Sequence, residues 1–276
     1  MEDLLQTDTD WMPIATEQED VLTPAVLHRL AALFDHDGAH WPAGVLPPLA
    51  HWLFFLPDAA QSALGVDGHP AHGALLPPLD APRRMWAGGR VTFHAALPIG
   101  AHATRRSIVT DIREKHGRSG TLTFVTVRHE IGTGNGPAIV EEQDLVFRQP
   151  GPGTPAPAPA DPRRPDGSRS LVPDATTLFR FSALTFNAHR IHYDRDYAVE
   201  QEGYPDLVVH GPMQAMLLAD HLLRAHPGRS LASFSFRGVR PLFVDRPLTL
   251  NRLADGTLWT TDADGCTGME AQATLA

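Results

Sequence analysis

A proline-rich stretch in the middle of the chain constrains the fold more than any other feature. Residues 149–169 read QPGPGTPAPAPADPRRPDGSR and hold seven prolines. Such a segment has few backbone donors, no apolar period and extended polyproline preferences, so it predicts a semi-rigid linker. It divides the 276-residue chain into residues 1–148 and residues 170–276. Each length suits one compact domain, so we expect two units.

Both parts show the same order of expected elements, in which helical segments precede a run of strands. In the first part, Thr23 and Pro24 begin a helix that ends near residue 34, and a second helix is expected at 48–56. In the second part, a strand is expected at 177–184 and a helix at 212–225. The other expected strands are 90–96, 103–114, 121–131 and 139–147 in the first part, and 232–237, 248–253, 257–262 and 269–275 in the second.

A faint internal repeat agrees with a duplication. The tripeptide GTL opens an expected strand in each part, at 120–122 and at 256–258. Phe and Pro recur at the same five-residue step after a strand, at 93–98 and at 236–241. Together with the order of elements, the repeat predicts an α+β fold made of two copies of one unit, in which an antiparallel sheet wraps one buried helix.

Composition excludes several classes of protein. The formal charge of −9, from 23 basic and 32 acidic residues, argues against nucleic-acid binding, which needs a basic surface. The lone cysteine, Cys266, excludes a disulfide framework and any multi-thiolate metal site. No secretory leader is visible, and the longest apolar stretch, near residues 46–57, is too short and too proline-broken to span a bilayer. We therefore expect a soluble cytoplasmic protein without a membrane partner.

The most unusual segment is FSALTFNAHRIHYDRDYA, at residues 181–198. It is followed by VHGP at 209–212, immediately before the expected buried helix, where Gly211 is a candidate N-cap and Pro212 a candidate first helical residue. Free backbone N–H groups at such a helix start can hold an oxyanion or polarise a carbonyl. Within eight residues the segment gathers a set of polar and ionisable side chains: Asn187, His189, Arg190, His192, Tyr193 and Asp194.

These residues resemble the reactive loop of the MaoC-like, hot-dog-fold (R)-specific enoyl-CoA hydratases. The strings FNAHRIHYD and HGPMQ are similar to one branch, the hydroxyacyl-thioester dehydratase type 2 family, which includes bacterial mesaconyl-CoA and itaconyl-CoA hydratases. PRRMWAGG at 82–89, KHGRSG at 115–120, VTVRHE at 125–130 and EEQD at 141–144 resemble the same branch. The resemblance implies a double hot-dog fold, with a degenerate N-terminal unit and the reactive loop in the C-terminal unit.

The resemblance also implies roles for individual residues. The position at which the wider family has a water-handling aspartate is Asn187 here, and a neutral amide cannot be a general base. His192 is therefore the expected base and proton donor, because imidazole titrates near neutral pH. Asn187 would orient the water or the thioester, and the Gly211 N–H would bind the thioester oxygen. Further substrate contacts are expected from Trp86, His189, Tyr193 and His210.

The expected function is that of a hydro-lyase, which adds water reversibly to a short enoyl-CoA. CoA is the carrier on the substrate, and no metal or redox cofactor is expected. Branch members act on acyl groups with a second carboxylate, which a planar guanidinium would bind bidentately. Arg190 and Arg84 are the two candidates for that contact. A homodimer is one option for the assembly, and the sequence leaves the oligomeric state open because a double hot-dog already pairs two units within one chain.

Other interpretations remain open. His189, His192 and His210 could bind a metal ion, or the loop histidines could only cap backbone groups. A hot-dog thioesterase would use the same helix amide, and a non-catalytic protein would bind CoA esters without turnover. Several residues also have a purely structural interpretation: Gly211 as a plain helix cap, Tyr193 as a packing residue, Arg190 in a pair with Asp194 or Asp196, Arg83 and Arg84 as solvated charges, and His69 and His72 as solvated loop residues.

Overall fold

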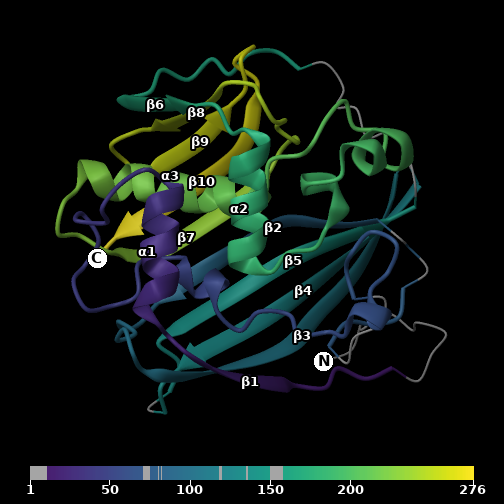
Figure 1. The fold of residues 1–276 in the computed structure, drawn as a ribbon, viewed down its shortest axis with the longest axis horizontal. Helices are drawn as coiled ribbons and strands as arrows, with labels where there is room; N and C mark the ends of the chain where they lie inside the picture. Colours follow the sequence, from purple (N-terminus) through teal and green to yellow (C-terminus); the bar gives the residue numbers. More distant parts are fainter. Residues whose placement is uncertain are drawn as a thin grey trace.

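Ten strands form one continuous sheet in the computed structural model (Figure 1). The structure describes residues 11–70, 75–79, 81, 83–117, 120–134, 136–149 and 158–276. The strand order is β1-β3-β4-β5-β2-β7-β10-β9-β8-β6, and every neighbouring pair is antiparallel. The strands are β1 (Thr16–Val21), β2 (Arg83–Phe93), β3 (His102–Gly117), β4 (Gly120–Gly132), β5 (Ile139–Arg148), β6 (Gly167–Leu171), β7 (Leu231–Gly238), β8 (Leu248–Arg252), β9 (Thr257–Thr261) and β10 (Thr267–Leu275).

The sheet has an internal symmetry that confirms the double hot-dog fold. Outward from the seam between β2 and β7, one half runs β5, β4, β3, β1 and the other runs β10, β9, β8, β6. The two strands that begin at the GTL repeats, β4 and β9, occupy equivalent places in the two halves. The seam itself pairs residues 88–92 with residues 233–237. The duplication expected from the sequence is therefore present in the topology.

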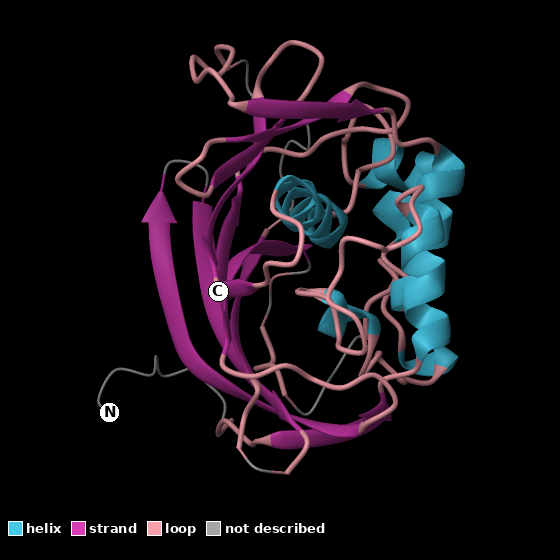
Figure 2. Ribbon diagram, turned by 90° about the vertical axis from the view of Figure 1, so that its left-hand side faces the viewer, coloured by secondary structure: helices cyan, strands magenta, loops and turns pink. Residues whose placement is uncertain are grey.

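Helix α3 (Gly211–Ala225) is the central helix of the C-terminal half, as expected. Its residues 213–223 are all buried, including Leu218 with none of its surface exposed, because the curled sheet encloses the helix (Figure 2). The helices α1 (Pro24–Leu33) and α2 (Ala175–Thr185) contact each other on the open side of the sheet. The curled sheet and this helix pair together shield α3 from water.

Two expectations about local structure were wrong. Residues 177–184 were expected to be a strand but form most of α2, because Asp174 caps the helix by accepting the Thr177 N–H at 2.7 Å. A helix was expected at 48–56, but only the one-turn 3₁₀ helix η1 (Ala50–Leu53) forms. Its flanks prevent elongation, because Leu49 and Phe55 have left-handed φ angles of 67° and 54°.

The end of the expected linker is ordered and packed. Its last residues begin β6, which the sequence did not indicate, and β1 was also missed. Before β6, the Arg163 guanidinium lies 4.4 Å from the centre of the Trp259 ring, and the Cys266 thiol donates to Ala158 O at 3.2 Å. The prolines from 150 to 157 lie outside the described residues. The division into units at 149–169 stays a prediction.

Candidate active site

The histidine-rich loop follows α2 and is shaped by its own backbone. Helix α2 ends at Phe186, whose left-handed φ of 48° turns the chain, and Asn187 N then donates to Ser182 O at 2.9 Å. The Asn187 Oδ1 accepts the His189 N–H at 2.9 Å, which closes a turn typical of Asn. The Asn187 oxygen is thus engaged in forming the loop.

His192 and His210 form a stacked pair in the interior. Their ring centres are 3.7 Å apart at an angle of 19°, and only 7% and 0% of these residues is exposed. His192 Nδ1 lies 2.7 Å from Val208 O, and since a carbonyl only accepts, Nδ1 carries the proton and Nε2 keeps a lone pair. Burial lowers the pKa of His192 to about 4, so the ring is a neutral base at physiological pH.

His210 is held by a hydroxyl on one side and lacks a partner on the other. Its Nε2 and the Ser182 Oγ are 2.9 Å apart, while its Nδ1 has no hydrogen-bond partner within the described ranges. Burial, followed by the proximity of His192 and His189, lowers the pKa of His210 well below its ordinary value. His210 is the N-cap of α3, so that Gly211 and not Pro212 is the first helical residue.

The imidazoles of His189 and His69 extend the row of rings from His192 toward the surface. The His189 ring centre lies 5.4 Å from that of His192 and 4.3 Å from that of His69. Burial lowers the pKa of His189 to about 2, with the neighbouring imidazoles adding to the shift. His69 comes from the N-terminal half, so the two halves meet at this site.

His69 is paired with a carboxylate. Its Nδ1 lies 2.8 Å from Asp67 Oδ2, and its backbone N–H donates to Asp67 Oδ1 at 3.0 Å. Burial alone would raise the pKa of Asp67, but the hydrogen bonds and charge of His69 hold it at about 2. Burial lowers the pKa of His69 and Asp67 opposes that shift. The neutral ring therefore donates Nδ1–H to the carboxylate and presents Nε2 as an acceptor.

The segment that carries Asp67 and His69 is docked on the histidine-rich loop by main-chain contacts. Arg190 N donates to Asp67 O at 2.9 Å. Gly68 has a φ of +89°, and a Cβ there would lie 1.9 Å from Ala188 O. Only glycine fits this approach. Sequence reasoning missed this contact and treated His69 as solvated, whereas 19% of its side chain is exposed.

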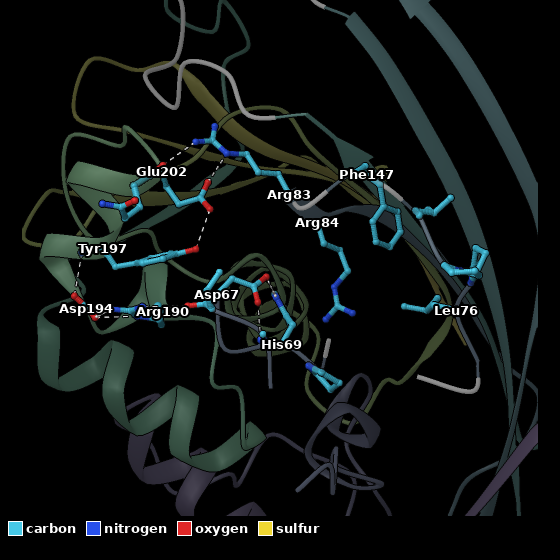
Figure 3. A pocket seen from close by; sticks show the side chains of 18 of the residues that line it. Asp67, His69, Leu76, Arg83, Arg84, Phe147, Arg190, Asp194, Tyr197 and Glu202 are labelled. Atoms are coloured by element: carbon cyan, nitrogen blue, oxygen red, sulfur yellow. Dashed lines mark hydrogen bonds and ion pairs between the residues drawn. The ribbon is translucent and has the colours of Figure 1, made fainter. Parts of the chain in front are cut away.

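A cavity of about 1360 Å³ opens beside this contact (Figure 3). Arg84, on β2, directs its guanidinium into the cavity toward His69. Its side chain forms no hydrogen bond or ion pair with the described part of the chain; burial lowers its pKa and the charge of Asp67 opposes this. The lining combines carboxylates, cations and apolar groups from both halves, among them Asp67, His69, Leu79, Arg84, Phe147, Arg190 and Tyr197.

Arg190 lines the same cavity but is already paired. Its guanidinium donates to Asp194 Oδ2 at 2.7 and 3.0 Å and to Val66 O at 3.1 Å, and it lies 4.2 Å from the centre of the Tyr197 ring. The alternative in which Arg190 pairs with Asp194 and shapes the loop is therefore what the structure shows. Tyr193 is 47% exposed and donates its hydroxyl to Ala188 O at 2.9 Å, a contact within the loop.

Trp86 and Gly211 meet at the start of α3. A Cβ at Gly211 would lie 2.8 Å from Trp86 Cε3, so the indole requires glycine at this position. Trp86 stacks on Phe236 across the seam, with ring centres 4.3 Å apart. The Gly211 N–H is among the first amides of the helix, which have no intrahelical acceptor. This amide stays a candidate for the thioester oxygen.

The metal-ligand geometry differs from the set considered in the sequence. The clusters of the described residues that could hold an ion are Asp67, His69 and His189, and His36, His40 and Asp220, with ligand atoms within 4.8 Å of one another. Arg84 adds a positive charge beside the first. In the second, Asp220 is already engaged by His40 at 2.6 Å, Trp41 at 3.1 Å and Arg224 at 2.8 Å. His72 lies outside the described residues.

Comparison with known proteins gives a consistent result. The sequence profile of hydroxyacyl-thioester dehydratase type 2 matches residues 49–244. The chain is 46% identical over 271 residues to mesaconyl-C(4)-CoA hydratase of Chloroflexus aurantiacus, covering 96% of both proteins. It is 28% identical over 248 residues to the mitochondrial hydroxyacyl-thioester dehydratase type 2 of Schizosaccharomyces pombe, covering 79% of this chain and 83% of that one. The structure of HtdX from Mycobacterium tuberculosis superposes with a TM-score of 0.64 at 16% identity, over 95% of this chain and 99% of that one.

Proposed function

Since the chain belongs to the hydroxyacyl-thioester dehydratase type 2 family and is a hydro-lyase of acyl thioesters, we propose that its substrate is a short enoyl-CoA with a second carboxylate, of the mesaconyl type. The reaction is the reversible addition of water to the carbon–carbon double bond conjugated to the thioester. The relative named for mesaconyl-C(4)-CoA supports this choice of acyl group.

The Arg84 guanidinium, which forms no ion pair with the described residues, is the observation that carries the proposal. A partly buried cation without a partner is costly, and a substrate carboxylate would supply one. Arg190 is the weaker candidate, because its guanidinium is already bound by Asp194 and Val66. Arg84 lies across the cavity from the loop that carries Arg190 (Figure 3), so a carboxylate on Arg84 would extend the acyl group past His69.

The chemical step assigns one proton transfer to His192. Its Nε2 accepts a proton from water as the water oxygen bonds to the β-carbon. The electron pair of the double bond moves toward the thioester oxygen, where the Gly211 N–H stabilises the developing enolate. The same proton then passes from Nε2 to the α-carbon. His192 ends the cycle neutral, so the step needs no external acid.

A substrate comparison tests the role of Arg84. In Arg84→Met, kcat/KM for mesaconyl-CoA should fall roughly 30-fold or more, which corresponds to a loss of about 2–5 kcal/mol in transition-state binding. The kcat/KM for crotonyl-CoA should stay within a few fold of the wild-type value. Arg190→Met is the matched control, because the Arg190 guanidinium is already bound by Asp194 and the Val66 carbonyl, and the rates for both substrates should fall together. Equal losses for the two esters in Arg84→Met would contradict the dicarboxylate proposal.

The remaining parts of the proposal concern cofactor and assembly. We propose a reaction without a metal or redox cofactor, because the candidate acid–base group, His192, is an imidazole with a lone pair available on Nε2. We also propose a cytoplasmic location and a homodimer, for which light scattering gives the mass in solution. Within the described residues, no helix is both long enough and apolar enough to cross a membrane.

A further inference from the structure

The Asp67–His69 pair is the one carboxylate–imidazole pair among the cavity-lining residues that the structure describes. Both side chains are partly buried, with 18% and 19% exposed. The Asp67 carboxylate holds the Nδ1–H of His69, which turns Nε2 into an acceptor on the ring's other side. His69 lines the cavity, whereas His192 and its partner His210 are not among the lining residues and are almost fully buried.

The segment that carries His69 is held by main-chain groups of both halves and by the Arg190 guanidinium. Gly65 N donates to His69 O at 2.6 Å and Gly68 N to Gly65 O at 3.0 Å, which closes the segment on itself. The Arg190 N–H and the Arg190 guanidinium bind the carbonyls of Asp67 and Val66. Side-chain substitutions at Asp67 and His69 leave all of these contacts available.

The hydration step gains from a second acceptor. A water molecule attacks the β-carbon with a lone pair, and holding both of its hydrogens points that lone pair at carbon. His192 Nε2 can hold one hydrogen. The Asn187 oxygen is engaged by the His189 N–H. The rings of His69 and His192 both contact the ring of His189. His69 is close enough to His192 to affect its pKa electrostatically.

We propose that His69 is a second catalytic residue, whose Nε2 binds the attacking water, and that Asp67 is the positioning residue that fixes the orientation of His69. This inference rests on the proposed hydratase function. It makes the active site a joint product of the two halves, because the N-terminal half supplies the group that the C-terminal loop lacks at Asn187.

The proposed hydration step transfers a single proton, which comes from the attacking water. One O–H bond of the water breaks, its proton goes to His192 Nε2, and the new C–O bond forms at the β-carbon. The second O–H bond stays intact, with its hydrogen donated to His69 Nε2, and becomes the hydroxyl of the product. The proton on His192 then passes to the α-carbon, and His69 is neutral throughout.

Turnover of two esters by purified full-length variants tests the proposal. His69→Gln should lower kcat for both mesaconyl-CoA and crotonyl-CoA by roughly 100-fold or more with little change in KM, because the loss falls on the chemical step. Combining it with His192→Gln should add less than the product of the two single losses, since both rings act on one water. The exposed His94 gives a matched control, and His94→Gln should keep full activity.

The positioning role of Asp67 has a readout of its own. The charged groups that face His69 are Asp67 and Arg84, and the imidazole of His189 is the neighbouring titratable group; of these, Asp67 is the one that raises the pKa of His69. Asp67→Asn removes that charge, so the acidic limb of the kcat/KM profile should shift to lower pH while kcat falls by roughly 10-fold or more. A merely structural role would leave that limb in place.

The outcomes separate this inference from the proposed function. A wild-type rate in His69→Gln, or an unmoved acidic limb in Asp67→Asn, overturns the roles of His69 and Asp67 alone. Activity lost to a chelator and restored by zinc would assign Asp67, His69 and His189 to a metal site and overturn the proposal. A wild-type protein that hydrates neither ester overturns both the inference and the function on which it rests.

Discussion

The two halves of the molecule share a topology but differ in what fills the hollow of the sheet. In the C-terminal half, the fifteen-residue helix α3 fills it and is buried on every side. In the N-terminal half, the four-residue turn η1 stands in that place, and among the described residues between it and β2 only the three-residue 3₁₀ turn η2 (Gln61–Ala63) is helical. The cavity is lined mainly by this irregular part of the N-terminal half and by the loop that precedes α3. The cavity thus lies on the side of the molecule where the central helical element is short.

The halves resemble each other in how they anchor these central elements. In the N-terminal half, the buried Glu141 binds His51 at 3.0 Å and the Trp52 indole at 2.7 Å, both on η1. In the C-terminal half, the buried Asp220 on α3 binds His40 and Arg224. In each half, one buried carboxylate therefore holds a helical element in place through hydrogen bonds. The difference in function lies in the loops and not in this anchoring.

The largest effect is expected where the two halves touch. In Gly68→Ala, the new methyl group would collide with Ala188 O, so the segment bearing Asp67 must leave the loop and turnover should fall by roughly 100-fold or more. Gly100→Ala is the matched control, because Gly100 has nearly the same φ, +88°, and has no atom within 4 Å of the added Cβ. Steady-state hydration rates and melting temperatures of both variants decide the matter. Equal losses in the two variants would show that backbone strain, and not the contact between halves, is responsible.

A smaller effect, on stability, tests the anchor of the N-terminal half. Burial would raise the pKa of Glu141, but its hydrogen bond and charge interaction with His51 lower it from 4.5 to about 2. A folded-state pKa below the unfolded one stabilises the protein above pH 4.5, and this contribution is lost as the pH falls toward 2. Glu141→Gln should therefore lose about 3 kcal/mol at neutral pH and show a flatter decline in acid.

Melting curves between pH 7 and pH 3 provide the measurement for Glu141. The neighbouring Glu142 is a suitable control, because it is paired near the surface with Arg90 and Glu142→Gln should change stability by less than about 1 kcal/mol. Parallel pH profiles for the wild type and Glu141→Gln would contradict the assignment of this carboxylate as an anchor.

The smallest effect is expected at Asn187. Its Oδ1 only accepts a hydrogen bond from the His189 N–H, and a carboxylate can accept the same bond, so Asn187→Asp should fold normally and change turnover by less than about 10-fold. The added negative charge should raise the pKa of the nearby imidazoles and shift the acidic limb of the rate profile to higher pH. A large gain in rate would indicate that the C-terminal loop can do without the help of Asp67.

Local signals were enough to predict most of the sheet and its helix. Alternating apolar residues located eight of the strands, and the step from Gly211 to Pro212 before an apolar run located α3. The failure at 177–184 has a local cause: the Asp174 cap outweighs the β-forming threonines and phenylalanines that follow it. The short edge strands β1 and β6 carry few apolar residues, so no periodic pattern marked them.

The site was predictable only in its C-terminal half. The sequence brought the residues from Asn187 to His192 together because they are neighbours in the chain. The pairing of Asp67 with His69 is also local, yet its contact with Ala188 and Arg190 spans more than a hundred residues, and no periodicity reports such a contact. The choice between Arg84 and Arg190 likewise depended on whether a carboxylate lies beside each guanidinium. Gly68 gave no specific signal either, because an Asp-Gly step in a loop is equally typical of a plain turn.

The two edges of the sheet bear on how uncontrolled association through edge strands is disfavoured. Strand order places β1 and β6 at the edges, where each pairs with a strand on one side only among the described residues. The unpaired N–H and C=O groups of an edge strand can pair with a strand from another molecule, which leads to aggregation. Strand β1 reads TEQEDV, with Glu17 and Glu19 exposed, so two such edges meeting would bring like charges together. The excess of acidic residues that makes the chain negative therefore also disfavours polymerisation through the β1 edge of the sheet.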